Sequence, residues 1–302
     1  MTTAVGKADP ASLPPLPGRL RRVLAPNPSP MTGPGTWTDI VGEGSVAVID
    51  PGPAIDSHLR AILSALRPGE RVTAILVTHT HNDHSGLARA LAQATGAPIH
   101  AFGPAGTGIS AVMQRLVDQG LRSGGEGIDT TFAPDMHLAE GDAINGPDWS
   151  LRALHTPGHT SNHLCFAWDD VLFCGDHVMG WAPSLVSPPD GDMGAYMASL
   201  QRLSGEGWRL MLPSHGDPVV DPAARLAELA AHRRGREAQL LTALAKGPAD
   251  LDTLTRRVYR DIAPGLLPAA SRNALAHLID LAERNQASAH PFPGPDALWS
   301  RF

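Results

Sequence analysis

The sequence contains few of the residues that mark disulfide-rich scaffolds and membrane proteins. Only two cysteines, Cys165 and Cys174, occur among 302 residues, and both lie in apolar runs where we expect buried, unreactive thiols. No apolar run approaches the ~20 residues that a membrane-spanning helix needs. The N-terminus lacks the basic and then apolar segments of a signal peptide. These absences predict a cytoplasmic protein that does not associate with membranes.

Aromatic residues are also scarce. They make up 5% of the chain and charged residues 18%, whereas hydrophobic residues reach 42%, a balance that fits a soluble globular protein. The net charge of −6 is unevenly spread: residues 221–302 hold 11 basic and 9 acidic residues, which leaves 13 basic and 21 acidic residues for the rest. This mild asymmetry permits an anionic partner for the C-terminal part but does not require one.

Composition and periodicity divide the chain into three parts. Residues 1–18 are rich in alanine and proline, and we expect them to be loosely ordered. Residues 19–220 alternate strand-like runs with polar loops and helical patterns. Residues 221–302 contain three helical patterns, the first interrupted at Gly235, followed by two strand-like runs that flank a Pro-Gly-Pro-Asp turn. Three helices and a two-stranded wing predict a winged-helix-like domain.

One loop in the middle part concentrates potential metal ligands. The apolar run Ala74–Val77 predicts a buried strand, and it ends at a loop with three histidines and one aspartate. His79 and His81 are one residue apart, so an extended segment points both side chains the same way. Asp83 and His84 follow directly. Imidazoles and carboxylates suit zinc and related ions, so this loop predicts a metal site.

Three later strand-like runs end in the same way. His159, Asp176 and His215 each lie in a loop just beyond a predicted buried strand. Loops at the carboxyl ends of strands in one α/β sheet converge on a common edge. We therefore expect all seven side chains to form one site.

The His-x-His-x-Asp-His loop and the order of the later ligand loops resemble the metallo-β-lactamase superfamily over roughly residues 20–220. This resemblance implies an α/β fold, namely a four-layer αββα sandwich, with two divalent ions. It assigns His79, His81 and His159 to the first ion, Asp83, His84 and His215 to the second, and Asp176 to both.

The same resemblance implies hydrolysis by a hydroxide held between the two ions. Zinc is the first expectation, and iron or manganese suits the same ligands. Asp83 is expected to be catalytic as well, because it would orient the nucleophile or accept its proton. His163 and His177 adjoin the ligand loops, so we expect them to orient ligands rather than bind metal.

The substrate remains open between alternatives. Classical zinc β-lactamases of the largest subclass carry cysteine where this chain has Asp176, so antibiotic hydrolysis is disfavoured. A carboxylate there is the pattern of glyoxalase-II-like thioesterases, lactonases and RNA-processing members. The C-terminal part resembles the β-lactamase-like protein 2 branch, which is associated with cleavage of single-stranded RNA. The hypotheses are a single-stranded RNA endoribonuclease, a hydrolase of small esters, thioesters or lactones, and a non-catalytic binding scaffold.

Two further regions bear on the partner. The last two helical patterns offer few cations for a duplex-binding module, so we expect no sequence-specific DNA binding; these cations are Arg256, Arg257, Arg260, Arg272 and Arg284. Residues 103–135 form a glycine-flanked insertion, which is either a lid over the site or a plain surface excursion.

Overall fold

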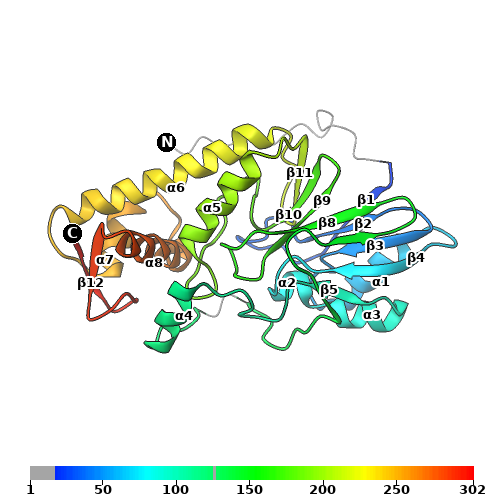
Figure 1. Ribbon diagram of the computed structural model, residues 1–302, viewed down its shortest axis with the longest axis horizontal. Coiled ribbons are helices and arrows are strands. Elements are labelled where there is room, and N and C mark those ends of the chain that lie inside the picture. The colour runs from blue at the N-terminus through cyan, green and yellow to red at the C-terminus, as the bar shows by residue number, and fades with distance from the viewer. Residues whose placement is uncertain (1–17, 125–126) are drawn as a thin grey trace.

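The computed structural model describes residues 18–124 and 127–302. The predicted loosely ordered terminus, residues 1–18, lies outside the described residues except for its last member. Two packed sheets with helices on both outer faces form one half of the molecule, and a smaller helical part with a two-stranded sheet forms the other (Figure 1).

The first sheet has six strands in chain order. They are β1 (Leu20–Leu24), β2 (Trp37–Val41), β3 (Ser45–Ile49), β4 (Arg71–Leu76), β5 (Ile99–Ala101) and β6 (Met136–His137). Strands β2 and β3 form an antiparallel hairpin, and β3, β4 and β5 then run parallel. The parallel pairing places Ile49 opposite Leu76, so the chain leaves β3 and β4 at the same edge of the sheet.

The second sheet has five strands in the order β11-β10-β9-β8-β7. They are β7 (Ala143–Asn145), β8 (Ser150–His155), β9 (Leu164–Trp168), β10 (Val171–Gly175) and β11 (Leu210–Pro213). Only β10 and β11 are parallel neighbours. The loops that follow β8, β10 and β11 carry the later three predicted ligands.

Alternation along the strands explains the layers. Leu76 and Phe173 face the core between the two sheets, whereas their neighbours Ile75 and Leu172 face outward. The outward face of the first sheet is covered by α1 (Asp56–Ser64) and α3 (Ala88–Thr95), and that of the second by α5 (Met193–Ser204) and α6 (Pro222–Leu244). The predicted four-layer αββα sandwich is confirmed.

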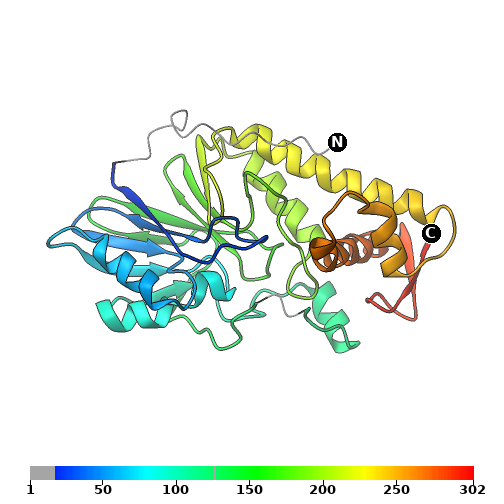
Figure 2. The same cartoon turned by 180° about the vertical axis from the view of Figure 1, so that it is seen from behind.

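The C-terminal part has the predicted winged-helix order. It contains α6, α7 (Leu251–Val258), a short 3-10 turn (Pro264–Leu266), α8 (Leu267–Glu283), β12 (Ala287–His290) and β13 (Leu298–Arg301). The strands pair antiparallel, and Ala249 bridges to Trp299 beside them. Figure 2 shows α6 running from the sandwich along this whole part.

One helix prediction is wrong. The helix that was expected to be interrupted at Gly235 continues through it to Leu244. A single glycine inside a helix costs about 1 kcal/mol. Packing on both sides outweighs that cost, because Leu226 and Leu229 are buried against the second sheet and Leu240 and Leu244 in the C-terminal core.

The insertion at residues 103–135 contacts the rest of the molecule at two places in its described part. Its helix, α4 (Ala111–Asp118), places Met113 and Leu116 in the hydrophobic core of the C-terminal part. Farther along, the Gly127 carbonyl accepts a hydrogen bond from the Asn82 backbone at 2.8 Å. The insertion therefore links the ligand loop to the C-terminal part and is not a detached surface excursion. In the portion of the chain that the structure describes, every helix is too short or too polar to traverse a bilayer.

Candidate metal centre

The predicted ligands meet at one edge of the sandwich. Two of them follow β4, two lie in the short helix α2 (Asn82–Ser85), and one lies beyond each of β8, β10 and β11. Their nitrogen and oxygen atoms form two groups, each within 4.8 Å: His79, His81, His159 and Asp176 in one, and Asp83, His84 and His215 in the other.

The first group has the spacing of an imidazole-bound ion. Nε2 of His79 lies 2.9 Å from Nδ1 of His81, and Nε2 of His159 lies 3.1 Å from the same atom. Nitrogen ligands at the usual 2.0–2.1 Å around a tetrahedral ion would be about 3.3 Å apart. The three buried rings therefore fit one ion.

The second group meets the first at Asp176. Oδ2 of Asp176 lies 3.7 Å from Nε2 of His159 and 3.6 Å from Nε2 of His84, while its Oδ1 lies 3.3 Å from Nε2 of His215. Oδ2 of Asp83 lies 3.3 Å from the same His215 atom. Asp176 thus faces both groups, as a shared ligand must.

Two buried atoms at this junction have no hydrogen-bond partner among the described residues: Nε2 of His84 and Oδ1 of Asp176. Buried polar atoms without partners are costly, so an orphaned donor set of this kind indicates a missing ligand. A divalent ion satisfies both atoms, and the donor set therefore fits a dinuclear metal site.

The remaining ring nitrogens orient the ligands. Those of four histidines contact an oxygen outside the two groups: His79 Nδ1 contacts Thr78 Oγ1 at 2.9 Å, His84 Nδ1 contacts Asp50 Oδ2 at 2.9 Å, His159 Nδ1 contacts the Leu185 carbonyl at 2.6 Å, and His215 Nδ1 contacts the Gly35 carbonyl at 3.2 Å. A ring that donates from one nitrogen presents the lone pair of the other to a metal.

Charge differs between the two groups. Burial lowers the pKa of His81 to about 3, and it lowers that of His79 as well, so these rings are neutral and able to bind a metal. Burial alone would also lower the pKa of His84, but the Asp83 and Asp176 carboxylates raise it well above its usual value. The two carboxylates therefore favour positive charge at the second group, as the ligands of a cation do.

The two histidines that we expect to orient ligands, His163 and His177, make different contacts in the structure. Nε2 of His163 accepts a hydrogen bond from the Asp176 backbone at 3.3 Å, and its ring stacks on His79 with centroids 5.1 Å apart. The ring of His177 instead packs against Tyr196 at 4.7 Å, and neither of its nitrogens has a hydrogen-bond partner in the described chain. His163 contacts ligands directly, and His177 reaches them only through packing.

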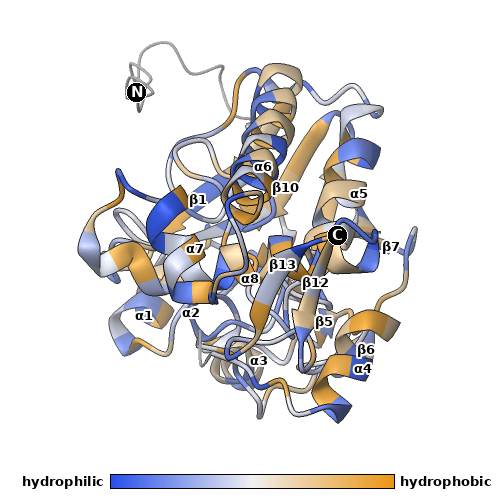
Figure 3. Cartoon of the chain, turned by 90° about the vertical axis from the view of Figure 1, so that its left-hand side faces the viewer, coloured by the Kyte–Doolittle hydropathy of each residue, from blue (hydrophilic) through white to orange (hydrophobic). Residues whose placement is uncertain are grey.

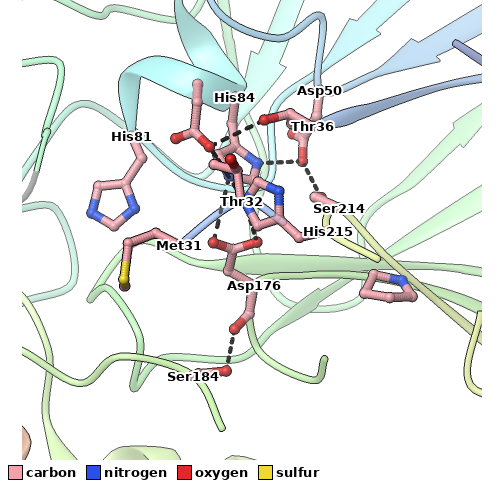
Figure 4. A network of polar contacts seen from close by, with 12 residues as sticks. Met31, Thr32, Thr36, Asp50, His81, His84, Asp176, Ser184, Ser214 and His215 are labelled. Atoms are coloured by element: carbon pink, nitrogen blue, oxygen red, sulfur yellow. Dashed lines mark hydrogen bonds and ion pairs between the residues drawn. The ribbon is translucent and has the colours of Figure 1, made fainter. Parts of the chain in front are cut away.

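Sequence reasoning missed Asp50, which is 1% exposed and lies directly after β3. Its carboxylate accepts hydrogen bonds from His84 and Ser214, both drawn in Figure 4, and also from Thr78. By itself, the sequence Asp50-Pro51-Gly52 predicts only the end of a strand. The rule that identified the ligands, a polar side chain just past a buried strand, also describes Asp50.

Comparisons with known proteins agree with this geometry. Residues 31–215 match the model of the Metallo-beta-lactamase superfamily, and residues 251–291 match that of the Beta-lactamase associated winged helix domain. The chain is 31% identical over 245 residues to an atrochrysone carboxyl ACP thioesterase of Aspergillus chevalieri, covering 77% of this chain and 70% of that protein. It is 28% identical over 278 residues to the Beta-lactamase-like protein 2 homolog of Drosophila melanogaster, covering 88% of each.

A solved structure has the same fold along nearly the whole chain. A Beta-lactamase domain protein from Burkholderia ambifaria superposes with a TM-score of 0.78 at 23% identity, covering 95% of this chain and 93% of that one. The likeness includes the C-terminal part as well as the sandwich.

Proposed function

Because this chain belongs to the metallo-β-lactamase superfamily and gathers its His and Asp side chains into two adjoining groups, we propose that this hydrolase cleaves esters or thioesters of small acyl substrates. The observation that carries the choice of substrate is the packing of α8. In winged-helix-type modules that read DNA, the corresponding helix lies in the major groove.

Here that helix is covered by the catalytic part. Ala276 of α8 is fully buried in the cluster that contains Val186 and Tyr196. Arg272 donates hydrogen bonds to the Ser187 hydroxyl and the Pro188 carbonyl. An occupied helix face supports a role for the C-terminal part inside the enzyme rather than on a nucleic acid.

The rim near the second ligand group is apolar. A Cβ at Gly216, the residue after His215, would lie 2.6 Å from the indole of Trp181, so this ring rests on the ligand loop. The same indole lies against Gly33, two residues from Met31. Met31 and Trp181 are 45% and 43% exposed. Exposed apolar side chains beside a polar site support an acyl group as the substrate.

The relatives support the same class. The similar protein from Aspergillus chevalieri is named as a thioesterase that acts on an acyl group carried by ACP. The acidic excess of the first 220 residues also disfavours a polyanionic substrate at the catalytic site.

The first group, which includes Asp176, would hold one ion, and the second group together with Asp176 would hold the other; we propose zinc, for which the histidine-rich donor set is suited. Two bound divalent ions supply the charge that activates water and polarises the carbonyl under attack. Asp83 is the most exposed ligand carboxylate, at 28% of its side chain, and the Thr36 hydroxyl donates to its Oδ2 at 3.1 Å. Burial would raise the pKa of Asp83, but His84 and His215 lower it, so its carboxylate is ionised and able to bind a cation.

The test is thiol release from an acyl-pantetheine thioester by zinc-loaded protein, with His84→Ala prepared identically. Cys165 and Cys174 are fully buried, and burial raises the pKa of Cys165 to about 12, so neither thiol interferes with a thiol reagent. Turnover by the unchanged protein alone supports the proposal. If the unchanged protein and His84→Ala hydrolyse this thioester at equal rates, and a simple aryl ester at equal rates as well, the proposal is contradicted.

Single-stranded RNA cleavage is the second candidate. A cavity of the C-terminal part is lined by Lys246, Arg257 and Arg260, which suits a phosphate chain. End-labelled single-stranded RNA is offered to the same two preparations. Cleavage by the unchanged protein alone, without thioester turnover, replaces the acyl proposal with this one.

A further inference from the structure

The segment Ser184–Pro188 lies between the metal centre and the C-terminal helices. The Leu185 carbonyl accepts the hydrogen bond of His159 Nδ1 at 2.6 Å. The Ser184 hydroxyl donates to the backbone carbonyls of Asp176, a contact drawn in Figure 4, and of His177 at 3.0 Å. This short segment therefore touches one ligand of the first group and the ligand shared by both.

Two side chains of the C-terminal helices hold the same segment. Nη2 of Arg233, on α6, donates to the Ser184 carbonyl. Oδ1 of Asn273, on α8, accepts from the Val186 backbone at 3.1 Å and from Nη1 of Arg233 at 3.1 Å. One hydrogen bond thus fixes the backbone on each side of Leu185. The direction of the Leu185 carbonyl, and with it the plane of the His159 ring, follows from these contacts.

The buried position of Arg233 is energetically unfavourable. It is 2% exposed, and among the described residues its Nε has no hydrogen-bond partner and no carboxylate forms an ion pair with it. Its guanidinium lies 5.0 Å from the centre of the Tyr196 ring. A buried cation without an anion destabilises a fold unless its hydrogen bonds are satisfied. Its hydrogen bonds converge on Ser184 and Asn273, which indicates a positioning role.

The helix that carries Asn273 is placed for this role. Viewed from the C-terminal side, α8 lies among α6, α7 and the strands β12 and β13 (Figure 3). Its remaining face meets the catalytic part, where Asn273 and Ala276 lie one helical turn apart. This face of α8 is used here to support the catalytic part.

We propose that Asn273 and Arg233 are positioning residues of the metal centre, through which the C-terminal part sets the orientation of His159 and the backbone of Asp176. The proposal rests on the metal assignment and is independent of the substrate. Partners that orient metal ligands typically change metal affinity by about 10–100-fold when they are removed.

The experiment measures zinc affinity by competition with a chromogenic chelator, and the absorption spectrum of the cobalt-substituted protein. Asn273→Leu keeps the volume but removes the acceptor, so we expect the first ion to bind about 10–100-fold more weakly and the cobalt spectrum to change. Asn273→Asp keeps an acceptor for Val186 and Arg233 and should restore both properties.

Arg284→Ala is the matched control. Arg284 joins Asp280 of α8 to Glu237 of α6 but does not contact Ser184–Pro188, so zinc affinity and the cobalt spectrum should not change. Asn273→Leu with unchanged affinity and spectrum contradicts the proposal. If that variant does not fold, Arg233→Lys, which cannot reach Ser184 and Asn273 together, decides by the same criteria. An unchanged protein that binds no metal would instead overturn the metal assignment itself.

Discussion

Nδ1 of His84 lies 2.9 Å from Oδ2 of Asp50, so a carboxylate at the end of β3 orients a histidine that follows β4. The other partners of the Asp50 carboxylate are the Thr78 backbone and hydroxyl, both at 2.8 Å, and the Ser214 hydroxyl at 2.9 Å. Thr78 and Ser214 directly precede His79 and His215. One carboxylate therefore aligns two of the loops that carry ligands, the one after β4 and the one after β11.

Asp50→Asn should weaken the second metal site. An amide keeps one acceptor but places a donor group where hydroxyl and imidazole donors already point, so the orientation of His84 is lost. We expect zinc affinity to fall by about 10–100-fold, measured by chelator competition. Asp56→Asn, at an exposed position six residues later, is the control and should bind zinc normally. Equal affinities for the two variants would contradict the role of Asp50.

Asp176→Ala should leave the fold intact but remove the second ion and nearly all turnover. Its carboxylate faces His159 on one side and His84 and His215 on the other, so neither group is complete without it. Elemental analysis after dialysis should show fewer than two ions per chain, and turnover should fall by more than about 100-fold. Asp217→Ala, two residues beyond His215 and exposed, serves as the control. Two ions at full occupancy in Asp176→Ala would refute the shared-ligand assignment.

Local pattern predicted the layers and the places of the ligands. The apolar runs around Ile49, Leu76 and Phe173 have the alternating or continuous hydrophobic pattern of buried strands. Polar residues directly beyond such strands converge, because parallel neighbouring strands end at one edge of the sheet. The family resemblance then assigned the ligands to two ions, and the structure brings all seven together. Metal binding by each residue stays a prediction.

Long-range contacts account for what the sequence did not reveal. The contact between Asp50 and Ser214 spans 164 residues, and that between Val186 and Asn273 spans 87. No local periodicity encodes such pairs. At Gly235 the local pattern predicted an interruption that does not occur. The glycine disfavours a helix, but packing of α6 against two separate cores stabilises the helix through it.

Gly158→Ala should destabilise the protein and disturb the first metal site. Gly158 has a φ of +148°, and a Cβ there would lie 2.4 Å from Cα and 2.7 Å from the backbone nitrogen of Tyr196. Backbone atoms cannot turn away as a side chain can, so the loop that carries His159 must shift. We expect the free energy of unfolding in urea to fall by about 1–3 kcal/mol.

Gly141→Ala separates strain from collision in that experiment. Gly141 has a φ of +85°, but a Cβ there would meet nothing within 4 Å. Its replacement should therefore cost only the backbone strain, about 1 kcal/mol, and should leave zinc affinity unchanged. If zinc affinity is also unchanged in Gly158→Ala, the close approach to Tyr196 does not control the ligand loop.

His277→Leu should reduce the fall in the free energy of unfolding that occurs in mild acid. His277 is 1% exposed on α8, and neither ring nitrogen has a hydrogen-bond partner among the described residues. Burial, with Arg233 and His232 adding to it, lowers the pKa of His277 to about 3, whereas an unfolded histidine titrates near 6.5. Below pH ~6.5 the His277 imidazole binds a proton in the unfolded chain but not in the folded chain, so the free energy of unfolding falls as pH drops toward ~3.

Each pH unit in that window corresponds to up to ~1.4 kcal/mol, so the unchanged protein should lose about 2 kcal/mol more than His277→Leu between pH 7 and pH 5. Urea unfolding is measured with metal removed from both proteins, because the ligand histidines then contribute equally and cancel. His290→Gln, at an exposed position of β12, should follow the unchanged protein. Parallel pH profiles for the unchanged protein and His277→Leu would mean that His277 is protonated in the folded state, which its burial beside the Arg233 guanidinium opposes.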